Sequence, residues 1–177
     1  YDLGRLSYEV GDFDGAIKVF KHYTDSSNVG YKKAKAEGFI ANSYTKTNDL
    51  DQAITYIESL PNQTTEIKET YQLVTLNKGI ELFNKHKFRQ ANVYFTKSLK
   101  YPLVEVNEIA ARYWRGECRS LAREWKTASW DYAEVLKKAN RSNEYYIKAN
   151  YGIAYTYFNR QSYKDARKYF SNYIELD

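Results

Sequence analysis

Four arginines stand at steps of three and four residues in one segment of the sequence: Arg112, Arg115, Arg119 and Arg123. This spacing places their side chains along one face of a helix. Guanidinium groups bind carboxylates and phosphates through paired hydrogen bonds, so the stripe predicts either internal ion pairs or a site for an anionic ligand, such as an acidic peptide, a phosphate or a glycan sulfate. Only arginines that internal carboxylates leave free could bind a ligand, and Arg112 and Arg123 are the candidates for this anion site.

The residue types that most often carry catalysis are sparse and far apart in the sequence. His22 and His86 are expected at helix ends or turns, and neither has cysteines or carboxylates around it at metal-ligand spacing. The single cysteine, Cys118, rules out an internal disulfide and is expected to be a buried, inert thiol. No phosphate-binding glycine loop and no nucleophile elbow is present. We therefore expect a non-catalytic protein without a metal or a cofactor.

Charge is distributed unevenly along the 177 residues. Residues 1–90 carry 12 Lys or Arg and 12 Asp or Glu, whereas residues 91–177 carry 15 and 10, so the net charge of +5 lies in the second half. This imbalance favours an acidic partner only weakly, and the absence of a nucleic-acid recognition motif argues against nucleic acid. No apolar run approaches the roughly 20 residues of a membrane span, so membrane insertion of this segment is not expected. The sequence also lacks methionine, and we expect it to be a piece of a longer protein.

An alanine recurs with a period of 37 or 38 residues and sets the positions of the elements that carry these side chains. An aromatic residue or leucine stands three positions before it, and a bulky residue stands four positions after it, as in Phe88, Ala91 and Phe95. The alanines are Ala16, Ala53, Ala91, Ala128 and Ala166. A second small residue lies twelve positions upstream of each, at Gly4, Ala41, Gly79, Gly116 and Ala154. Such periodicity is typical of a helical repeat protein, in which small residues let the two helices of a unit cross closely.

This pattern resembles the tetratricopeptide repeat (TPR) family. The strings GIELFNKHKFRQANVYFTKSLKYP (79–102) and GIAYTYFNRQSYKDARKYFSNYI (152–174) match its order of small residue, aromatic residue after a turn, alanine and second aromatic residue. The resemblance implies an all-α fold, a right-handed α-solenoid of antiparallel helix pairs with about five units and ten helices. The expected units are residues 1–28, 29–63, 64–102, 103–140 and 141–177, within a single array over 1–177.

Apolar residues at helical spacing predict the two helices of the third unit at 66–85 and 88–99. The period exceeds the usual 34 residues of a TPR by about one helical turn. We therefore expect longer first helices rather than longer loops.

In the TPR family the first helices line a concave face that binds peptides, so the resemblance implies a scaffold for protein or peptide partners. The residues expected on that face are Arg5, Tyr8, Asn42, Lys46, Asn77, Phe83, Tyr113, Glu117, Tyr151, Tyr155, Phe158 and Asn159. Only Asn42 and Asn77 match the carboxylate clamp of the family, so that binding mode is not expected. Each ring could instead pack against a neighbouring helix.

The fourth unit departs from the family at Arg115 and Arg119, where TPRs carry apolar residues. A buried guanidinium group needs a carboxylate partner. Glu81, on the preceding first helix, is expected to pair with Arg115 and with Arg119.

Three alternatives to peptide binding stay open. The basic, aromatic second half could bind a polyanion, either nucleic acid or an acidic glycan. The array could self-associate through uncapped ends, or it could act only as a spacer. Long repeats rich in Tyr, Asn and Lys also resemble bacterial multi-TPR proteins of the cell envelope, which implies a periplasmic or envelope location.

Overall fold

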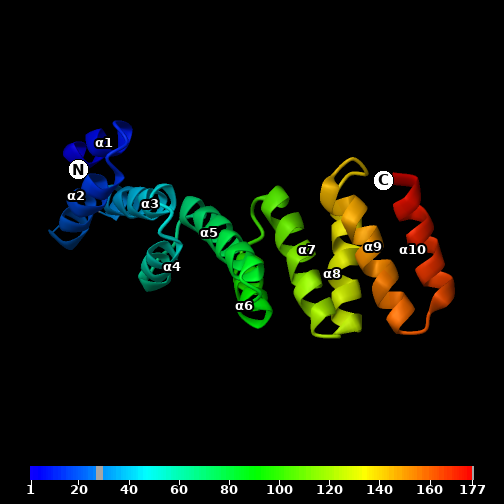
Figure 1. The fold of residues 1–177 in the computed structure, drawn as a ribbon. Helices are drawn as coiled ribbons and strands as arrows, with labels where there is room; N and C mark the ends of the chain where they lie inside the picture. Colours follow the sequence, from blue (N-terminus) through cyan, green and yellow to red (C-terminus); the bar gives the residue numbers. More distant parts are fainter. Residues whose placement is uncertain (27–29, 177) are drawn as a thin grey trace. The chain divides into compact units, whose positions relative to one another are not determined.

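The computed structural model describes residues 1–26 and 30–176, and these residues form ten α-helices and no strand (Figure 1). The helices are α1 (Asp2–Glu9), α2 (Phe13–Ser26), α3 (Gly30–Lys46), α4 (Leu50–Ser59), α5 (Thr65–Asn84), α6 (Phe88–Ser98), α7 (Glu105–Leu121), α8 (Trp125–Lys138), α9 (Glu144–Asn159) and α10 (Tyr163–Leu176). One helix pair falls within each predicted repeat unit. The predicted boundary between residues 28 and 29 lies outside the described residues.

The predicted helices of the third unit are confirmed to within a residue at each end, at α5 and α6. The first helices α3, α5, α7 and α9 have 17, 20, 17 and 16 residues, whereas their second helices α4, α6, α8 and α10 have 10, 11, 14 and 14. In the first repeat the order is reversed, with 8 residues in α1 and 14 in α2. In the last four repeats the first helix is therefore the longer one, in line with the prediction from the sequence.

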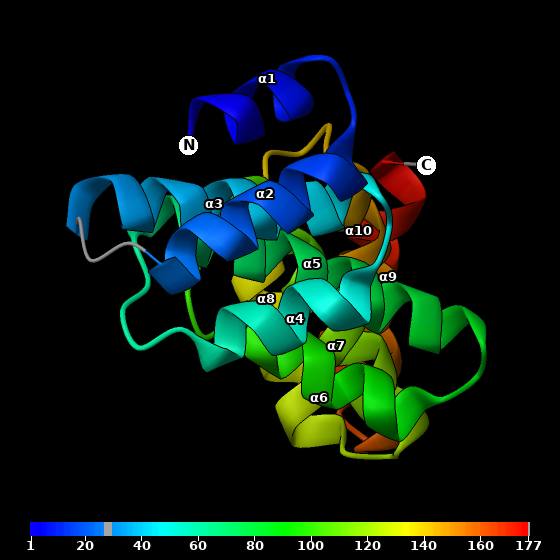
Figure 2. The same ribbon diagram turned by 90° about the vertical axis from the view of Figure 1, so that its left-hand side faces the viewer.

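The chain divides within α5 into two compact units, Tyr1–Thr75 and Leu76–Asp177, which are described separately. In the first unit, α1 and α2 form a hairpin, α3 packs on α2, and α4 packs on α3 (Figure 2). The stacked rings of Phe20 and Phe39, with centroids 5.0 Å apart, join α2 to α3 in its core.

In the second unit, each helix from α6 to α10 packs on the next, and α7 also contacts α9. Its two apolar clusters are centred on Phe95 of α6 and Tyr132 of α8, both fully buried. Both residues stand four positions after a repeat alanine, so the repeat pattern itself builds this core.

The five repeat alanines are all buried, as expected for close helix crossings. The small residue of the first helix, however, makes room for the ring that follows the alanine rather than for the alanine. A Cβ atom added to Gly116 would lie 2.8 Å from the ring of Tyr132, and one added to Gly4 would lie 2.9 Å from the ring of Phe20. The small residue of the first helix therefore accommodates the ring that the second helix carries four residues after its alanine.

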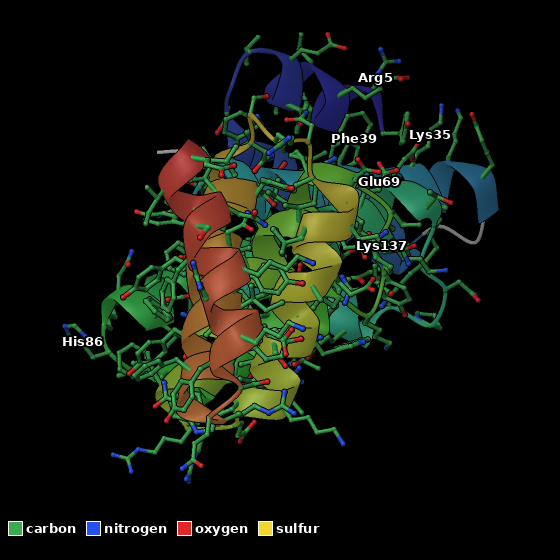
Figure 3. All side chains as sticks on the ribbon, turned by 90° about the vertical axis from the view of Figure 1, so that its right-hand side faces the viewer. Arg5, Lys35, Phe39, Glu69, His86 and Lys137 are labelled. Atoms are coloured by element: carbon green, nitrogen blue, oxygen red, sulfur yellow. The ribbon has the colours of Figure 1, made fainter. Side chains whose placement is uncertain are left out.

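Each helix pair turns through one residue with a positive φ. These residues are Gly11, Asn48, His86, Arg123 and Gln161, with φ between 57° and 83°. The left-handed conformation terminates a helix and suits glycine best. The side chain of His86 points away from the ribbon at its turn (Figure 3).

Because glycine relieves the left-handed strain, we expect Gln161→Gly to raise the free energy of unfolding by about 1 kcal/mol. Gln161 is exposed, so its side chain has little packing to lose. Urea denaturation followed by circular dichroism measures the change. The exposed helical residue Arg167 provides the control, since Arg167→Gly should lower stability by about 1 kcal/mol. Equal losses in both variants would contradict the role assigned to the turn.

Candidate functional site

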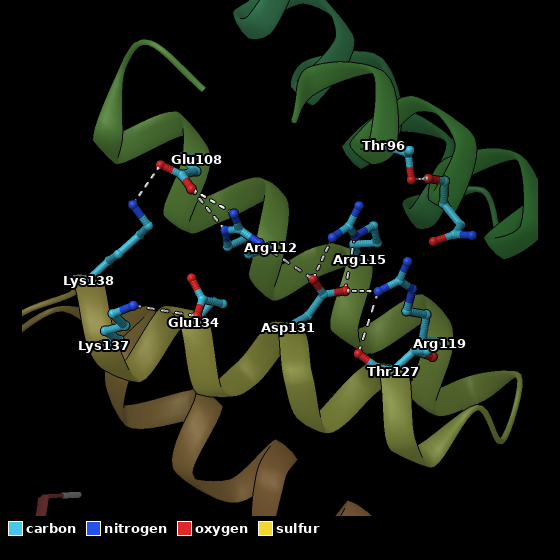
Figure 4. A network of polar contacts seen from close by, with 11 residues as sticks. Thr96, Glu108, Arg112, Arg115, Arg119, Thr127, Asp131, Glu134, Lys137 and Lys138 are labelled. Carbon is cyan, nitrogen blue, oxygen red and sulfur yellow. Dashed lines mark hydrogen bonds and ion pairs between the residues drawn. The ribbon is translucent and has the colours of Figure 1, made fainter. Parts of the chain in front are cut away.

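The arginine stripe of α7 is held by a carboxylate on the facing helix α8 (Figure 4). Arg115 donates two hydrogen bonds to Asp131, from Nε to Oδ2 at 3.0 Å and from Nη2 to Oδ1 at 2.7 Å. Arg119 Nη1 donates to Oδ2 of the same carboxylate at 2.7 Å. Asp131 is fully buried and Arg115 nearly so. The stripe therefore ties together the two helices of one hairpin.

The predicted pairing of Glu81 with Arg115 and Arg119 is wrong. Glu81 instead accepts hydrogen bonds from Lys85, one turn later in sequence, and from Lys78 at 3.5 Å. The pKa of Glu81 is lowered, mainly by the hydrogen bond from Lys85. The arginines take the carboxylate within their own hairpin, which is buried with them.

A sequence signal for Asp131 was present but missed. The equivalent position, three residues after each repeat alanine, is Val19, Tyr56, Tyr94 or Tyr169 in the other units. The fourth unit, which carries the arginines, has a carboxylate at this position. The change from valine or tyrosine to aspartate indicates an ion pair that neutralises the arginines.

Arg112 is not the free cation that the sequence predicts. Its guanidinium group bonds Glu108 at 2.9 Å and lies 5.5 Å from the centre of the Trp130 ring. Lys138 Nζ reaches the second oxygen of Glu108 at 3.2 Å, as Figure 4 shows. Arg112 is occupied because the first turn of α7 supplies a carboxylate four residues upstream.

Arg123, the other candidate for the anion site, is exposed at the turn between α7 and α8. It borders an open pocket of about 440 Å³ together with Lys126 and Arg160. The structure therefore separates Arg123 from the paired arginines of the stripe.

Four of the predicted partner-binding residues gather in one pocket between α7 and α9. Tyr113, Glu117, Tyr151 and Tyr155 line a space of about 390 Å³. The same pocket is lined by Ser120, Leu121, Tyr132, Lys148, Gly152 and Tyr173. We call it the tyrosine pocket.

The carboxylate of Glu117 lies in the wall of the tyrosine pocket. The hydroxyl of Tyr132 donates to Glu117 Oε1 at 2.6 Å, and the hydroxyl of Tyr113 lies near enough to lower the pKa of the carboxylate. Burial raises the pKa of Glu117 above its usual value, and the two hydroxyls and Lys148 offset only part of that rise. Burial likewise raises the pKa of Tyr132, so its hydroxyl stays protonated and acts as a donor.

Two glycines clamp the ring of Tyr132 and thereby place its hydroxyl. A Cβ atom on Gly152 of α9 would lie 2.6 Å from the ring, and Gly116 of α7 lies against the ring as well. The ring therefore fits only because neither helix carries a side chain there. Residues of α7, α8 and α9 together fix the position of the Tyr132 hydroxyl, which donates to Glu117.

Two partly exposed rings of α9 form the opposite wall. Tyr151 and Tyr155 are 50% and 41% exposed, and their rings lie parallel with centroids 6.4 Å apart. Trp125 contacts Tyr155 edge-on at 5.8 Å, and Tyr173 contacts Tyr151 at 5.5 Å. These contacts hold the rings in place while their exposed area remains available to a partner.

The other predicted partner-binding residues of the second unit lie outside the tyrosine pocket. Phe158 is exposed and contacts Tyr163, whereas the Asn159 side chain bonds the carbonyl of Tyr155. Phe83 packs against Phe88 and Trp114, and Asn77 is exposed. Phe83 therefore serves packing.

In the first unit, Arg5 and Asn42 border a separate pocket of about 470 Å³. Arg5 pairs with Glu9, and Asn42 accepts a hydrogen bond from Thr70 at 3.0 Å. Tyr8 packs against Phe13 and Phe39, while Lys46 is exposed at the end of α3. Polar groups of this pocket are thus already engaged with neighbours.

Tyr132 is the bulky residue four positions after Ala128, and neither Tyr132 nor Lys148 is among the residues predicted to bind a partner. The signal for Tyr132 was its hydroxyl, because the equivalent residues Phe20, Ile57, Phe95 and Phe170 have none. Lys148 stands one turn before Gly152 on α9, bonds Glu144 at 2.8 Å and lines the pocket.

The remaining reactive groups offer no further site within the described part of the chain. Cys118 is buried, and burial raises its pKa to about 12, which suppresses the thiolate. Residues 1–26 and 30–176 contain no cluster of His, Cys, Asp and Glu suited to a metal. None of the helices in these ranges has the length and apolar character of a membrane span.

The successive helix pairs, with small residues at their crossings, define a TPR-like helical repeat fold of the all-α solenoid class. Crystal structures of MamA have a similar fold. One matches with a TM-score of 0.58 at 19% identity over 99% of this chain and 88% of that chain, and a second with 0.57 at 18% over 99% and 95%. MamA from Desulfovibrio magneticus RS-1 matches with 0.52 at 11% identity over 99% and 91%. No family model and no curated protein matches the sequence.

Proposed function

We propose that the chain is a non-catalytic scaffold for protein interaction and that the tyrosine pocket docks an extended segment of a partner protein. The observation that carries the proposal is the wall of partly exposed tyrosines beside a partly buried carboxylate. Tyrosine rings offer large, rigid contact area at a low cost in conformational entropy, and they are enriched at interfaces.

The dimensions of the pocket also suit a peptide. Its volume of about 390 Å³ falls in the range of ligand-binding clefts, and it mixes apolar ring faces with a few fixed polar groups. Such a site can bury one or two side chains of a segment that crosses α7 and α9. Similarity to the MamA fold is compatible with this use but shows the fold alone.

Panning a library of random twelve-residue peptides against the chain tests the proposal. We expect selected peptides to bind a Tyr151→Ala/Tyr155→Ala variant at least tenfold more weakly, because each truncated ring removes interface contact worth about 1 kcal/mol or more. Fluorescence anisotropy measures the affinities.

Tyr31→Ala is the matched control, since Tyr31 is also exposed but lies on α3 of the first unit. It should leave binding unchanged. If the peptides bind the double variant as tightly as the wild type, docking in the tyrosine pocket is contradicted.

Polyanion binding remains the competing function, and ionic strength separates the two. Affinity for a polyanion falls steeply between 50 and 200 mM salt, whereas a contact dominated by rings depends on salt much less. The pairing of Arg112, Arg115 and Arg119 with carboxylates weighs against the polyanion function, because it leaves fewer cations for a ligand.

A further inference from the structure

The carboxylate of Glu117 lies in the wall of the tyrosine pocket and forms no ion pair with the described residues that line it. Its hydrogen bond comes from the hydroxyl of Tyr132, and no ion pair of Glu117 occurs among residues 1–26 and 30–176. Lys148 is the basic residue of the pocket and lies near enough to lower the pKa of Glu117, but its ion pair is with Glu144 at 2.8 Å. A desolvated carboxylate without a counter-ion is unfavourable, and a cation that enters the pocket would relieve that cost.

The walls around the carboxylate are suited to the same kind of group. Tyr113, Tyr132, Tyr151 and Tyr155 all contribute to the pocket. The face of an aromatic ring attracts a cation within about 6 Å, with a gain of about 0.5–2 kcal/mol per contact. Rings and carboxylate thus favour one ligand chemistry, a positive charge on an apolar stem.

This combination is confined to the fourth repeat. The residues equivalent to Glu117 in the other units are Arg5, Asn42, Ile80 and Tyr155. The ring equivalent to Tyr132 carries a hydroxyl in no other unit. Packing of the repeat therefore requires neither the carboxylate nor the hydroxyl.

We propose that the tyrosine pocket holds the side-chain ammonium group of a lysine carried by the docked protein segment, with Glu117 as its counter-ion and Tyr151 and Tyr155 as its walls. The inference rests on the docking function proposed above. Ammonium fits better than guanidinium because Tyr132 already occupies Oε1 of the carboxylate, which disfavours the two parallel bonds that arginine makes.

The experiment uses peptides from the panning and compares each lysine with norleucine, which has nearly the same shape without the charge. We expect the selected peptides to contain lysine, and the change to norleucine to weaken binding about tenfold or more. In the Glu117→Gln protein, lysine and norleucine peptides should bind within about twofold of each other. Glutamine keeps an acceptor for Tyr132, so the variant should fold.

Binding should also depend on pH through Glu117. The groups that interact with it are Tyr113 and the adjacent Cys118 on α7, Tyr132 on α8 and Lys148 on α9. Because its pKa is raised in the folded protein, affinity for lysine peptides should fall as pH drops through that raised value. A raised pKa means that the folded state binds the proton more tightly than the unfolded state, so the folded protein gains stability as pH falls through this range. At higher pH the ionised Glu117 lowers stability. We therefore expect Glu117→Gln not to lower stability at pH 7. The affinity of the Glu117→Gln protein should not change over the pH range in which the wild-type affinity falls.

The outcomes separate this inference from the docking function. Norleucine peptides that bind as well as lysine peptides, or arginine peptides that bind better, overturn the ammonium site while docking stands. If n-butylammonium chloride competes at the concentration of the peptide, the ligand is a free cation and the assignment to a protein segment falls. If no peptide is selected, the docking function fails, and this inference fails with it.

Discussion

The Asp131→Ala protein is expected to lose about 3–5 kcal/mol of its free energy of unfolding. Alanine leaves Arg115 buried without its two bonds and removes the partner of Arg119, and an uncompensated buried charge is among the most costly single changes. Urea denaturation followed by circular dichroism measures the loss.

The control for this prediction is Glu134→Ala on the same helix. Glu134 lies 4.0 Å from the exposed Lys137, and such surface pairs contribute little, so a change within about 0.5 kcal/mol is expected. The Asp131→Leu/Arg115→Met double variant should recover most of the stability, because apolar residues can replace a buried ion pair. A loss below about 1 kcal/mol for Asp131→Ala would contradict the structural role of the network.

A single methyl group at Gly152 should affect both the core and the tyrosine pocket. The added Cβ would lie 2.6 Å from the ring of Tyr132, so the ring or α9 must shift, at a cost of about 1–3 kcal/mol. Because the same ring donates to Glu117, we expect Gly152→Ala to weaken peptide binding as well as stability. Thermal unfolding and anisotropy measure the two effects.

Gly38→Ala is the matched control, since Gly38 lies in α3 and its added Cβ meets nothing within 4 Å. That variant should gain about 0.5–1 kcal/mol from helix propensity. If Gly152→Ala also gained stability, the clamp on Tyr132 would be refuted.

Local features of the fold were predictable from the sequence. Helix periodicity depends on residues three and four positions apart, so the spacing around Ala91 was enough to place α5 and α6. The partner of a charged residue depends instead on which helix faces it. For Arg115 the sequence offered several carboxylates, and the one on its own hairpin, Asp131, was overlooked in favour of Glu81.

The candidate site was predictable only in part for a similar reason. Tyr113, Glu117, Tyr151 and Tyr155 follow from the register of the first helices, and the structure brings them together. The hydroxyl of Tyr132 reaches Glu117 because the ring lies between two glycines on neighbouring helices. Sequence spacing within one helix does not predict such a contact between helices.

Nuclear magnetic resonance tests the central claim most directly. A selected peptide is titrated into ¹⁵N-labelled protein while the backbone amide signals are followed. The account predicts saturable shifts centred on the residues that line the tyrosine pocket, including Ser120, Leu121, Tyr151 and Tyr155. Saturable shifts confined to residues 1–75, with the tyrosine pocket unaffected, would contradict it.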